Sequence, residues 1–361
     1  MINVLYVGMT SGVGGVENFI CNVIDKIDKN KFSITVLTHQ NINKIYLNRI
    51  NGKCKIVKVS GIKKGIFIFL KELFDCYSKQ FDIVHLNECS AKFFIYCIPV
   101  LFKKDIKLII HSHNGDGKSI FHTLLNPIQN RRANIKCACS EMAARWMFGH
   151  DYVNCKYIKN GIDTFKYKYS MQKRRKFRKE IDVDDDVFVI GSVARFETQK
   201  NHVKILDVFE EYIKYNNNCK LVLVGDGTLK KHIQYLVMDK HIDDMVIFLN
   251  NRDDICDVLS GFDMLLMPSL YEGLPFIAIE AQASGLPILI SDSVDSEVKI
   301  TDLVFQEKLT RSNKIWAEKV HKIYELNINR QNDMYTDKIR QYGYDIDDTV
   351  KLIQEMYEES L

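Results

Sequence analysis

Two glutamates separated by a glycine and a proline are the most chemically suggestive feature of the sequence. Glu272 and Glu280 stand eight residues apart in the stretch SLYEGLPFIAIEAQASGLP. Such a pair can act as an acid–base couple, bind a metal ion, or have no chemical role. Pro275 suits the first turn of a helix and Gly285 suits its end. We therefore expect Glu272 just before a helix and Glu280 within it.

The start of this predicted helix also offers an anion site. The first N–H groups of a helix have no partner inside it and lie at the positive end of the helix dipole. A helix rises about 7.5 Å between Pro275 and Glu280, at roughly 1.5 Å per residue, so the two carboxylates would lie on opposite sides of a bound anion. The N–H groups expected to face that anion belong to Gly273, Leu274, Phe276 and Ile277.

Two cations follow another predicted strand. In VFVIGSVARFETQKNH, which begins at Val187, the apolar run ends just before Arg195, and Lys200 comes five residues later. Two fixed cations past the carboxyl end of a strand can neutralise a diphosphate without a metal. The alternative is an ordinary surface arginine and lysine.

A glycine-rich loop, GMTSGVGGVENF, follows the first apolar run. Gly12 and Gly14 have the spacing of a dinucleotide fingerprint, but Glu17 stands where the third glycine belongs, which disfavours a dehydrogenase. Gly12, Gly14 and Gly15 still leave N–H groups at the opening of a helix, where an anion or a sugar could approach the backbone. A tight turn without a ligand is the alternative.

The elements that must position these residues form two series. Apolar runs of strand length alternate with amphipathic stretches, a pattern typical of parallel sheets covered on both faces. The first series starts at Ile2, Phe32, Cys54, Phe81, Lys107 and Ile135, and the second at Val187, Lys220, Met245, Phe262 and Leu286.

This pattern predicts an α/β protein with two Rossmann-like, doubly wound domains, at 1–165 and 166–345, joined through the charged segment 166–186. The last stretch, 346–361, has an apolar stripe at Val350, Ile353 and Met356 or Tyr357, and we expect it to pack back on the first domain. Because open α/β sheets bind ligands at the carboxyl ends of their strands, the cleft between the domains is the expected active site.

Composition indicates a globular, cytoplasmic protein with reduced thiols. Hydrophobic residues make up 46% of the chain, and its ten cysteines include no C-x-x-C pair. We expect no signal peptide, and the longest apolar run, 93–102, is about half of what a membrane-spanning helix needs.

Charge is distributed unevenly along the chain. Residues 1–170 carry 25 Lys and Arg against 12 Asp and Glu, and the remainder carries 25 against 34. With the basic, aromatic stretch from Lys63 to Phe74, this favours peripheral association of the first domain with an anionic membrane surface rather than nucleic-acid binding. The alternatives to membrane association are that the lysines are ordinary solvated surface residues and that the aromatic stretches, including 90–104, are core helices beside the first sheet.

Seven motifs together resemble one enzyme family. GGVE (from Gly14), HSHN (from His111), NGID (from Asn160), RFETQKN (from Arg195), LVLVGDG (from Leu221), PSLYEGLP (from Pro268) and EGLPFIAIE (from Glu272) occur in the order found in the family 4 glycosyltransferases of GT-B fold, whose E-x7-E motif the last one matches. The stretches HSHN and IEAQASGLP are most similar to the branch that builds bacterial capsular polysaccharides and exopolysaccharides.

The resemblance implies a role for each candidate residue. Arg195 and Lys200 would hold the diphosphate of a nucleotide-sugar, Glu272 the donor sugar and Glu280 the ribose. Gly14 and Gly15 would approach the diphosphate through their backbone. His113 would contact the donor sugar, whereas we expect His111 to be structural and Asn160 to shape a turn.

The reaction implied is transfer of a sugar with retention of configuration, without a protein base, metal or other cofactor. The expected donor is a UDP-hexose or UDP-N-acetylhexosamine, and the expected acceptor is a polyprenyl-diphosphate-linked saccharide. The acidic run DVDDD (182–186) precedes a strand and therefore reads as a solvated turn rather than a metal site. A nucleotide-sugar 2-epimerase of the same fold and a catalytically silent partner subunit are the alternatives.

Overall fold

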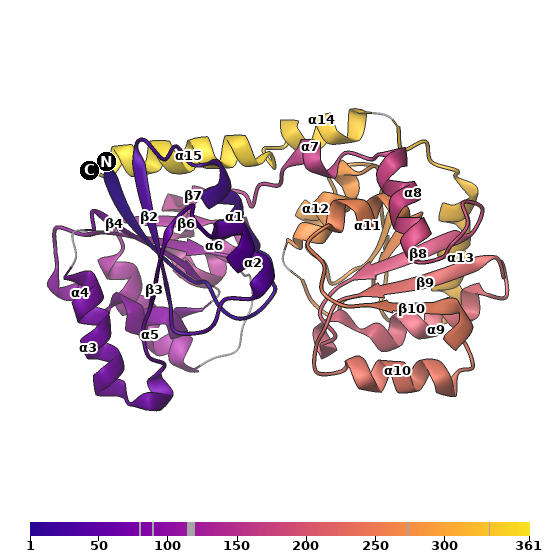
Figure 1. Cartoon of the computed structure of the whole chain (residues 1–361), viewed down its shortest axis with the longest axis horizontal. Helices are drawn as coiled ribbons and strands as arrows, with labels where there is room; N and C mark the ends of the chain where they lie inside the picture. Colours follow the sequence, from indigo (N-terminus) through magenta and orange to yellow (C-terminus); the bar gives the residue numbers. More distant parts are fainter. Residues whose placement is uncertain (79–80, 89, 114–119, 273, 332) are drawn as a thin grey trace. The chain divides into compact units, whose positions relative to one another are not determined.

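The chain folds into two compact units (Figure 1). The computed structural model describes residues 1–78, 81–88, 90–113, 120–272, 274–331 and 333–361. One unit contains Met1–Gly161 and Asp345–Leu361, and the other contains Ile162–Tyr344. Each has its own parallel sheet with helices, which confirms the predicted α/β class with two doubly wound domains.

The chain passes between the units slightly earlier than the predicted boundary after residue 165. Gly161 lies tightly against the start of the C-terminal helix, since a Cβ atom there would be 2.4 Å from Thr349 Oγ1. Ile162 is already part of the second unit's core, and its N–H donates to Tyr344 O at 2.9 Å. The chain thus passes from one unit to the other between Gly161 and Ile162 and returns between Tyr344 and Asp345. The residues next to these points are packed or hydrogen-bonded within their own units.

The first unit is built on a sheet with the strand order β3-β2-β1-β4-β5-β6-β7, in which every pairing is parallel. The strands are β1 (Ile2–Val7), β2 (Phe32–Thr38), β3 (Lys55–Lys58), β4 (Ile83–Glu88), β5 (Lys107–Ser112), β6 (Ile135–Ala138) and β7 (Lys156–Tyr157). The chain builds outward from β1 to β3 and then returns to place β4 beside β1, so the strand order reverses between β1 and β4.

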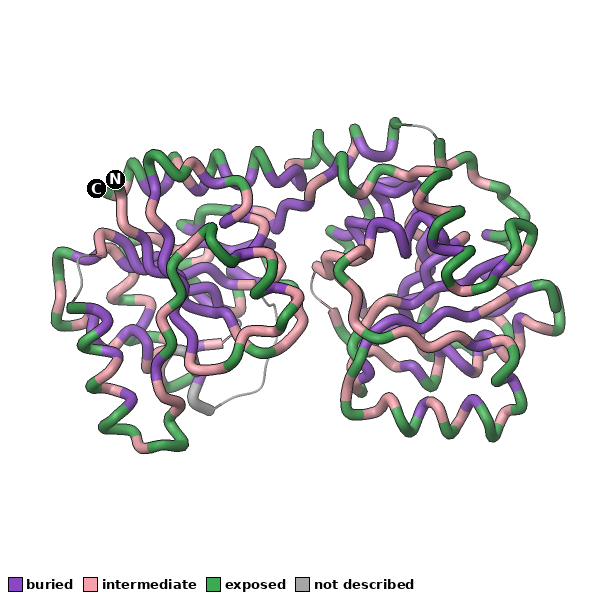
Figure 2. Tube along the Cα trace, viewed as in Figure 1, coloured by how far each residue is buried: buried purple, intermediate pink, exposed green. Residues whose placement is uncertain are grey.

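Helices cover this sheet, and Figure 2 shows the buried residues concentrated along its strands. The α-helices are α1 (Gly15–Lys26), α2 (Lys44–Ile50), α3 (Ile66–Tyr77), α4 (Ile98–Phe102), α5 (Ile120–Arg132), α6 (Glu141–Phe148) and α15 (Ile346–Glu359). Three 3-10 helices are η1 (Ile62–Lys64), η2 (Ala91–Cys97) and η3 (Gly149–Asn154).

The C-terminal helix α15 belongs to the first unit (Figure 1). Val350, Ile353, Met356 and Tyr357 are buried. The Tyr357 hydroxyl donates to the Tyr6 hydroxyl at 2.7 Å and lies 2.5 Å from His85 Nδ1.

The second unit repeats the arrangement with the strand order β10-β9-β8-β11-β12-β13, again with parallel pairings. The strands are β8 (Phe188–Val193), β9 (Cys219–Val224), β10 (Val246–Leu249), β11 (Met264–Met267), β12 (Ile288–Ser291) and β13 (Val304–Glu307). Here the order reverses between β8 and β11, so the loops that follow these two strands lie next to each other.

The helices of this unit are α7 (Thr164–Tyr167), α8 (Met171–Glu180), α9 (His202–Tyr212), α10 (Lys230–Asp239), α11 (Ile255–Gly261), α12 (Phe276–Ala283), α13 (Asn313–Glu325) and α14 (Met334–Gln341). The 3-10 helices are η4 (Thr198–Lys200), η5 (Asp243–Met245) and η6 (Ser296–Val298).

The prediction of a charged linker over 166–186 was wrong for its central part. Residues 171–180 form α8, which is capped by the Ser170 side chain, and Arg178 is only 2% exposed. Arg178 Nε donates to Gly261 O at 3.0 Å, and its Nη2 forms an ion pair with Asp263. A buried, paired arginine anchors a helix whose sequence alone looks solvated.

Candidate functional site

In the second unit, the predicted cations and the first glutamate come from adjacent strands. Arg195 and Lys200 follow β8, and Glu272 follows β11. Two hydrogen bonds join the loop after β8 to the loop after β11: Leu270 N donates to Gln199 O at 2.8 Å, and Gln199 Nε2 donates to Tyr271 O at 2.9 Å. The switch point of this sheet, where doubly wound proteins bind ligands, therefore carries three of the predicted site residues.

Lys200 and Glu272 form an ion pair through Nζ and Oε1. Their side chains are 17% and 9% exposed, so the pair is largely shielded from solvent. The backbone of Glu272 forms a parallel bridge with Val294, which fixes the position from which its side chain reaches the lysine. Arg195, by contrast, is exposed at the same edge of the sheet.

The helix after Glu272 begins one residue later than predicted. Pro275 is the N-cap of α12, and Phe276 is the first helical residue. Leu274 and Phe276 are partly buried, whereas Glu280 lies inside the helix and is 4% exposed. The helix ends at Ala283, with Ser284 as its C-cap and Gly285 next at φ +62°, as the sequence predicts. Gly273 lies outside the described residues.

In the first unit, Gly14 is the N-cap of α1 and Gly15 is its first residue. Glu17, three residues after the cap, turns back on the glycine loop, where its carboxylate accepts a hydrogen bond from Thr10 Oγ1. A Cβ atom on Gly14 would lie 2.9 Å from Glu17 Oε2. The residue that disfavours a dinucleotide fingerprint therefore closes the loop through its own carboxylate.

His113 follows β5 and is held by two asparagines. Its Nε2 lies 3.1 Å from Asn87 Oδ1 and its Nδ1 lies 3.0 Å from Asn160 Oδ1. The Phe19 ring lies against it with the centroids 4.7 Å apart. Burial lowers the pKa of His113 to about 4, so the imidazole is neutral at physiological pH.

The sequence did not identify these asparagines as part of the site. Asn160 was expected to shape a turn, and Asn87 was not singled out, although it lies near the end of β4 beside β5. His111 is fully buried, with His85 Nε2 3.3 Å from its Nδ1, a surrounding that suits the structural role expected of it.

Comparison with known families assigns the two units. Residues 13–166 match the family model "Glycosyltransferase Family 4", and residues 173–340 match "Glycosyl transferases group 1". The chain belongs to the family 4 glycosyltransferases of GT-B fold.

One relative of this glycosyltransferase matches nearly its whole length, and others match part of it. EpsF of Bacillus subtilis (strain 168), which is named as a glycosyltransferase, is 29% identical, covering 98% of this chain and 96% of EpsF. The UDP-Gal:alpha-D-GlcNAc-diphosphoundecaprenol alpha-1,3-galactosyltransferase of Escherichia coli is 32% identical over 37% of this chain and 36% of the relative. The crystal structure of Anabaena Alr3699/HepE with UDP-glucose has a TM-score of 0.83 at 15% identity, covering 99% of this chain and 100% of that one, which establishes the likeness of fold.

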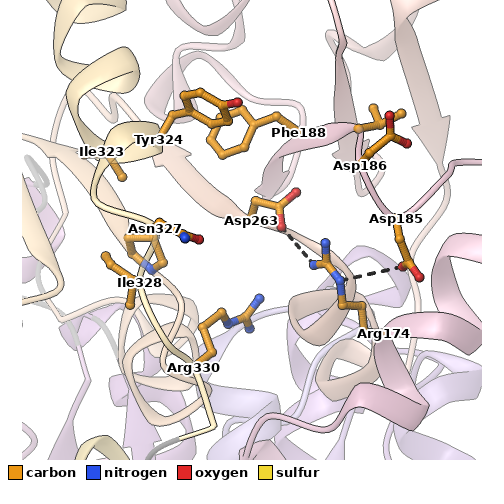
Figure 3. Close-up of a pocket in the computed structure, with 12 residues that line it drawn as sticks. Arg174, Asp185, Asp186, Phe188, Asp263, Ile323, Tyr324, Asn327, Ile328 and Arg330 are labelled. Carbon is orange, nitrogen blue, oxygen red and sulfur yellow. Dashed lines mark hydrogen bonds and ion pairs between the residues drawn. The ribbon is translucent and has the colours of Figure 1, made fainter.

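A cavity of about 250 Å³ lies where β8, β11 and β12 begin, at the other end of these strands from Lys200 and Glu272 (Figure 3). Arg174 Nη1 donates to Asp263 Oδ1 at 2.8 Å, and Arg174 also lies 4.0 Å from Asp185. No predicted site residue of the glycosyltransferase lines this cavity. We interpret it as a structural junction between α8 and the sheet.

Within the described ranges, no group of three or more His, Cys, Asp or Glu side chains is arranged to hold a metal ion. In the same part of the chain, no helix is long and apolar enough to span a bilayer.

Proposed function

We propose that this glycosyltransferase moves a hexose or N-acetylhexosamine from a UDP-sugar to a polyprenyl-diphosphate-linked saccharide, with retention of configuration, in capsular or exopolysaccharide synthesis. The observation that carries the proposal is the convergence of Lys200 and Glu272 at the switch point of the second sheet. The donor and acceptor classes are supported by the name of the E. coli relative and by two similar folds crystallised with UDP-glucose and with UDP and GlcNAc.

The chemistry required at such a site is stabilisation of charge. As the bond from the anomeric carbon to the phosphate oxygen breaks, positive charge develops on the sugar and negative charge on the diphosphate. Arg195, Lys200 and the first N–H groups of α12 would stabilise the leaving diphosphate. Glu272 would hold hydroxyls of the sugar, and Glu280 the ribose.

In the proposed front-face course, the acceptor hydroxyl forms the new bond on the side from which the diphosphate leaves. Its proton passes to the departing phosphate oxygen, so no protein base is needed. Gly14 and Gly15 of the first unit would approach the diphosphate, and His113 the sugar.

We also propose that transfer needs no metal, because two cations and a helix N-terminus can offset the charge of the diphosphate. Transfer should therefore continue in EDTA at an undiminished rate. Loss of transfer in EDTA and its return with Mn²⁺ would contradict this part of the proposal.

The surface proposed to meet the membrane is the one formed by η1, α3 and the end of α4. Phe67 is 84% exposed and Phe102 75% exposed, and the Phe102 ring lies 6.0 Å from that of Phe74. The exposed lysines on these segments are Lys63, Lys64 and Lys71, and Lys104 is exposed just after α4. An apolar surface bordered by ammonium groups fits the headgroup region of an anionic bilayer.

Flotation with phosphatidylglycerol-containing liposomes tests this surface. The wild type should float at low salt, whereas Phe67→Ser should reduce flotation severalfold. Met238→Ser serves as a matched control, because Met238 is 66% exposed on α10 of the second unit. Absence of flotation at low salt, or equal losses in both variants, would contradict the assignment.

A thermal-shift screen against UDP, GDP, ADP and their sugars tests the donor assignment. Binding to the folded state raises the unfolding midpoint by mass action, so UDP and UDP-sugars should raise it. A shift with GDP and none with UDP would overturn the choice of nucleotide. A silent partner subunit should show no sugar transfer and no release of free nucleoside diphosphate.

A further inference from the structure

Lys200 and Glu272 are bound to each other, although the proposed function gives them different parts of the donor. Within the described part of the chain, each is the other's only ion-pair partner. A diphosphate that reaches Lys200 therefore meets a carboxylate that already holds the ammonium group.

The contact is fixed by the fold. Besides the bonds between Gln199 and residues 270–271, Asn201 Nδ2 donates to Pro268 O at 3.0 Å. Glu272 is held from the other side, since its N–H donates to Ser293 O at 3.4 Å and its carbonyl accepts from Asp295 N at 3.3 Å. Neither backbone segment can withdraw without breaking these bonds, so the two side chains start within reach of each other.

Low exposure makes the contact more costly to break than a surface ion pair. Exposed pairs are screened by water and salt, whereas shielded pairs are screened much less. A diphosphate placed against Lys200 would also lie close to the Glu272 carboxylate, and like charges at short range repel. Glu272 must therefore gain another partner if the diphosphate is to bind without this penalty.

We propose that Glu272 sets the preference of the site for the intact nucleotide-sugar over the nucleoside diphosphate. Sugar hydroxyls of the donor draw Glu272 away and leave Lys200 to the diphosphate. After transfer the hydroxyls are gone, Glu272 returns to Lys200, and the nucleoside diphosphate is released. The inference rests on the proposed function, because it takes the donor to be a nucleotide-sugar held by these two residues.

Calorimetric titration with UDP and with UDP-glucose tests the proposal. Glu272→Gln removes the competing charge, so it should tighten UDP binding about fivefold, a size expected from a partly shielded ion pair. The same variant should not tighten UDP-glucose binding, so the ratio of the two dissociation constants should shift toward UDP. Glu272→Ala should give the same direction of change.

A double-mutant cycle assigns the effect to the pair. In a Lys200→Met background, Glu272→Gln should no longer tighten UDP binding, since no ammonium is left to compete for. Glu210→Gln is the matched control, because Glu210 pairs with Lys240 elsewhere in the same unit at 2.7 Å. It should leave both dissociation constants unchanged, and melting temperatures check that each variant is folded.

The outcomes separate the inference from the proposed function. If the wild type binds UDP but folded Glu272→Gln binds it equally or more weakly, the inference is wrong and the proposed function stands. Tightening that persists in the Lys200→Met background also overturns it. If the wild type binds none of UDP, GDP, ADP or their sugars, the proposed function fails and the inference fails with it.

Discussion

His113, the histidine predicted to contact the donor sugar, is itself held on both sides. Asn87 donates its Nδ2 to His85 O at 3.3 Å, which directs its Oδ1 at His113 Nε2. A neutral imidazole has one donor and one acceptor nitrogen, whereas an imidazolium has two donors. Asn160 Oδ1 lies 3.0 Å from Nδ1, so a proton on either ring nitrogen finds an oxygen acceptor.

These contacts predict the effect of Asn160→Asp. A carboxylate beside Nδ1 favours the imidazolium form and raises the pKa of His113, typically by one to three units. The pH profile of transfer should therefore gain a titration in the weakly acid range that the wild type lacks, because the wild-type pKa is about 4. Asn160→Ala should lower the rate without adding this titration. Identical profiles for the three proteins would contradict this contact between residue 160 and His113.

At the scale of elements, His85, His111 and His113 connect β4, β5 and the C-terminal helix. His85 and His111 are fully buried, and His113 is partly buried. His85 and His111 are stacked with centroids 5.4 Å apart, and His113 lies 4.2 Å from His111. Burial lowers the pKa of His85 to about 3 and that of His113 to about 4, and it lowers the pKa of His111 as well. All three are therefore neutral in the folded protein.

Their neutral state predicts acid sensitivity of the first unit. In the unfolded chain a histidine binds a proton below its pKa of about 6.5. In the folded chain these histidines stay neutral until the pH approaches 4, so the free energy of unfolding decreases as the pH falls from about 6.5 to 4. Each such histidine costs about 2 kcal/mol at pH 5. Urea unfolding at pH 7 and pH 5 should show this loss of stability. In His85→Gln, the difference in unfolding free energy between pH 7 and pH 5 should be smaller than in the wild type. A stability independent of pH across this range would contradict the assignment.

In the second unit, Arg330 joins the ends of two helices. Its guanidinium donates to Leu259 O at 2.8 Å near the end of α11 and to Ser284 O at 3.1 Å at the end of α12. It also lies 4.5 Å from the Tyr169 ring. Because α12 carries Glu280 and begins beside Glu272, this arginine supports the site from the far end of the helix.

Arg330→Met should therefore destabilise the second unit. The lost hydrogen bonds leave carbonyl groups unpaired, and we expect a loss of about 3 kcal/mol, measured by chemical unfolding. Arg311→Met is the control, because Arg311 is exposed and its side chain should contribute little. Equal stability of the two variants would show that the Arg330 bonds contribute nothing.

At the scale of the whole molecule, the sequence predicted the class of fold and most strands, because apolar runs of strand length are a local signal. It missed β7 and β13, which are short edge strands with partly buried or exposed residues. It also misread α8, because the partner that buries Arg178 is 85 residues away in the chain. Local patterns do not contain such contacts.

The same distinction between local and long-range signals applies to the candidate site. The motifs indicated Arg195, Lys200, Glu272 and Glu280, but only the strand order, with β11 beside β8, brings Lys200 and Glu272 together across 72 residues. The asparagines around His113 likewise come from separate parts of the first unit, Asn87 from β4 and Asn160 from the loop after β7. Side-chain types could be predicted from motifs, whereas their partners depend on topology.

Release of free nucleoside diphosphate from a UDP-sugar, in the presence of a polyprenyl-diphosphate-linked saccharide, tests the central claim most directly. The wild type should release UDP and lengthen the lipid-linked saccharide by one sugar. Folded Glu272→Gln should still bind UDP but transfer at least about 100-fold more slowly, since it loses a contact to the reacting sugar. Turnover at the wild-type rate in that variant would remove Glu272 from the site and contradict the account.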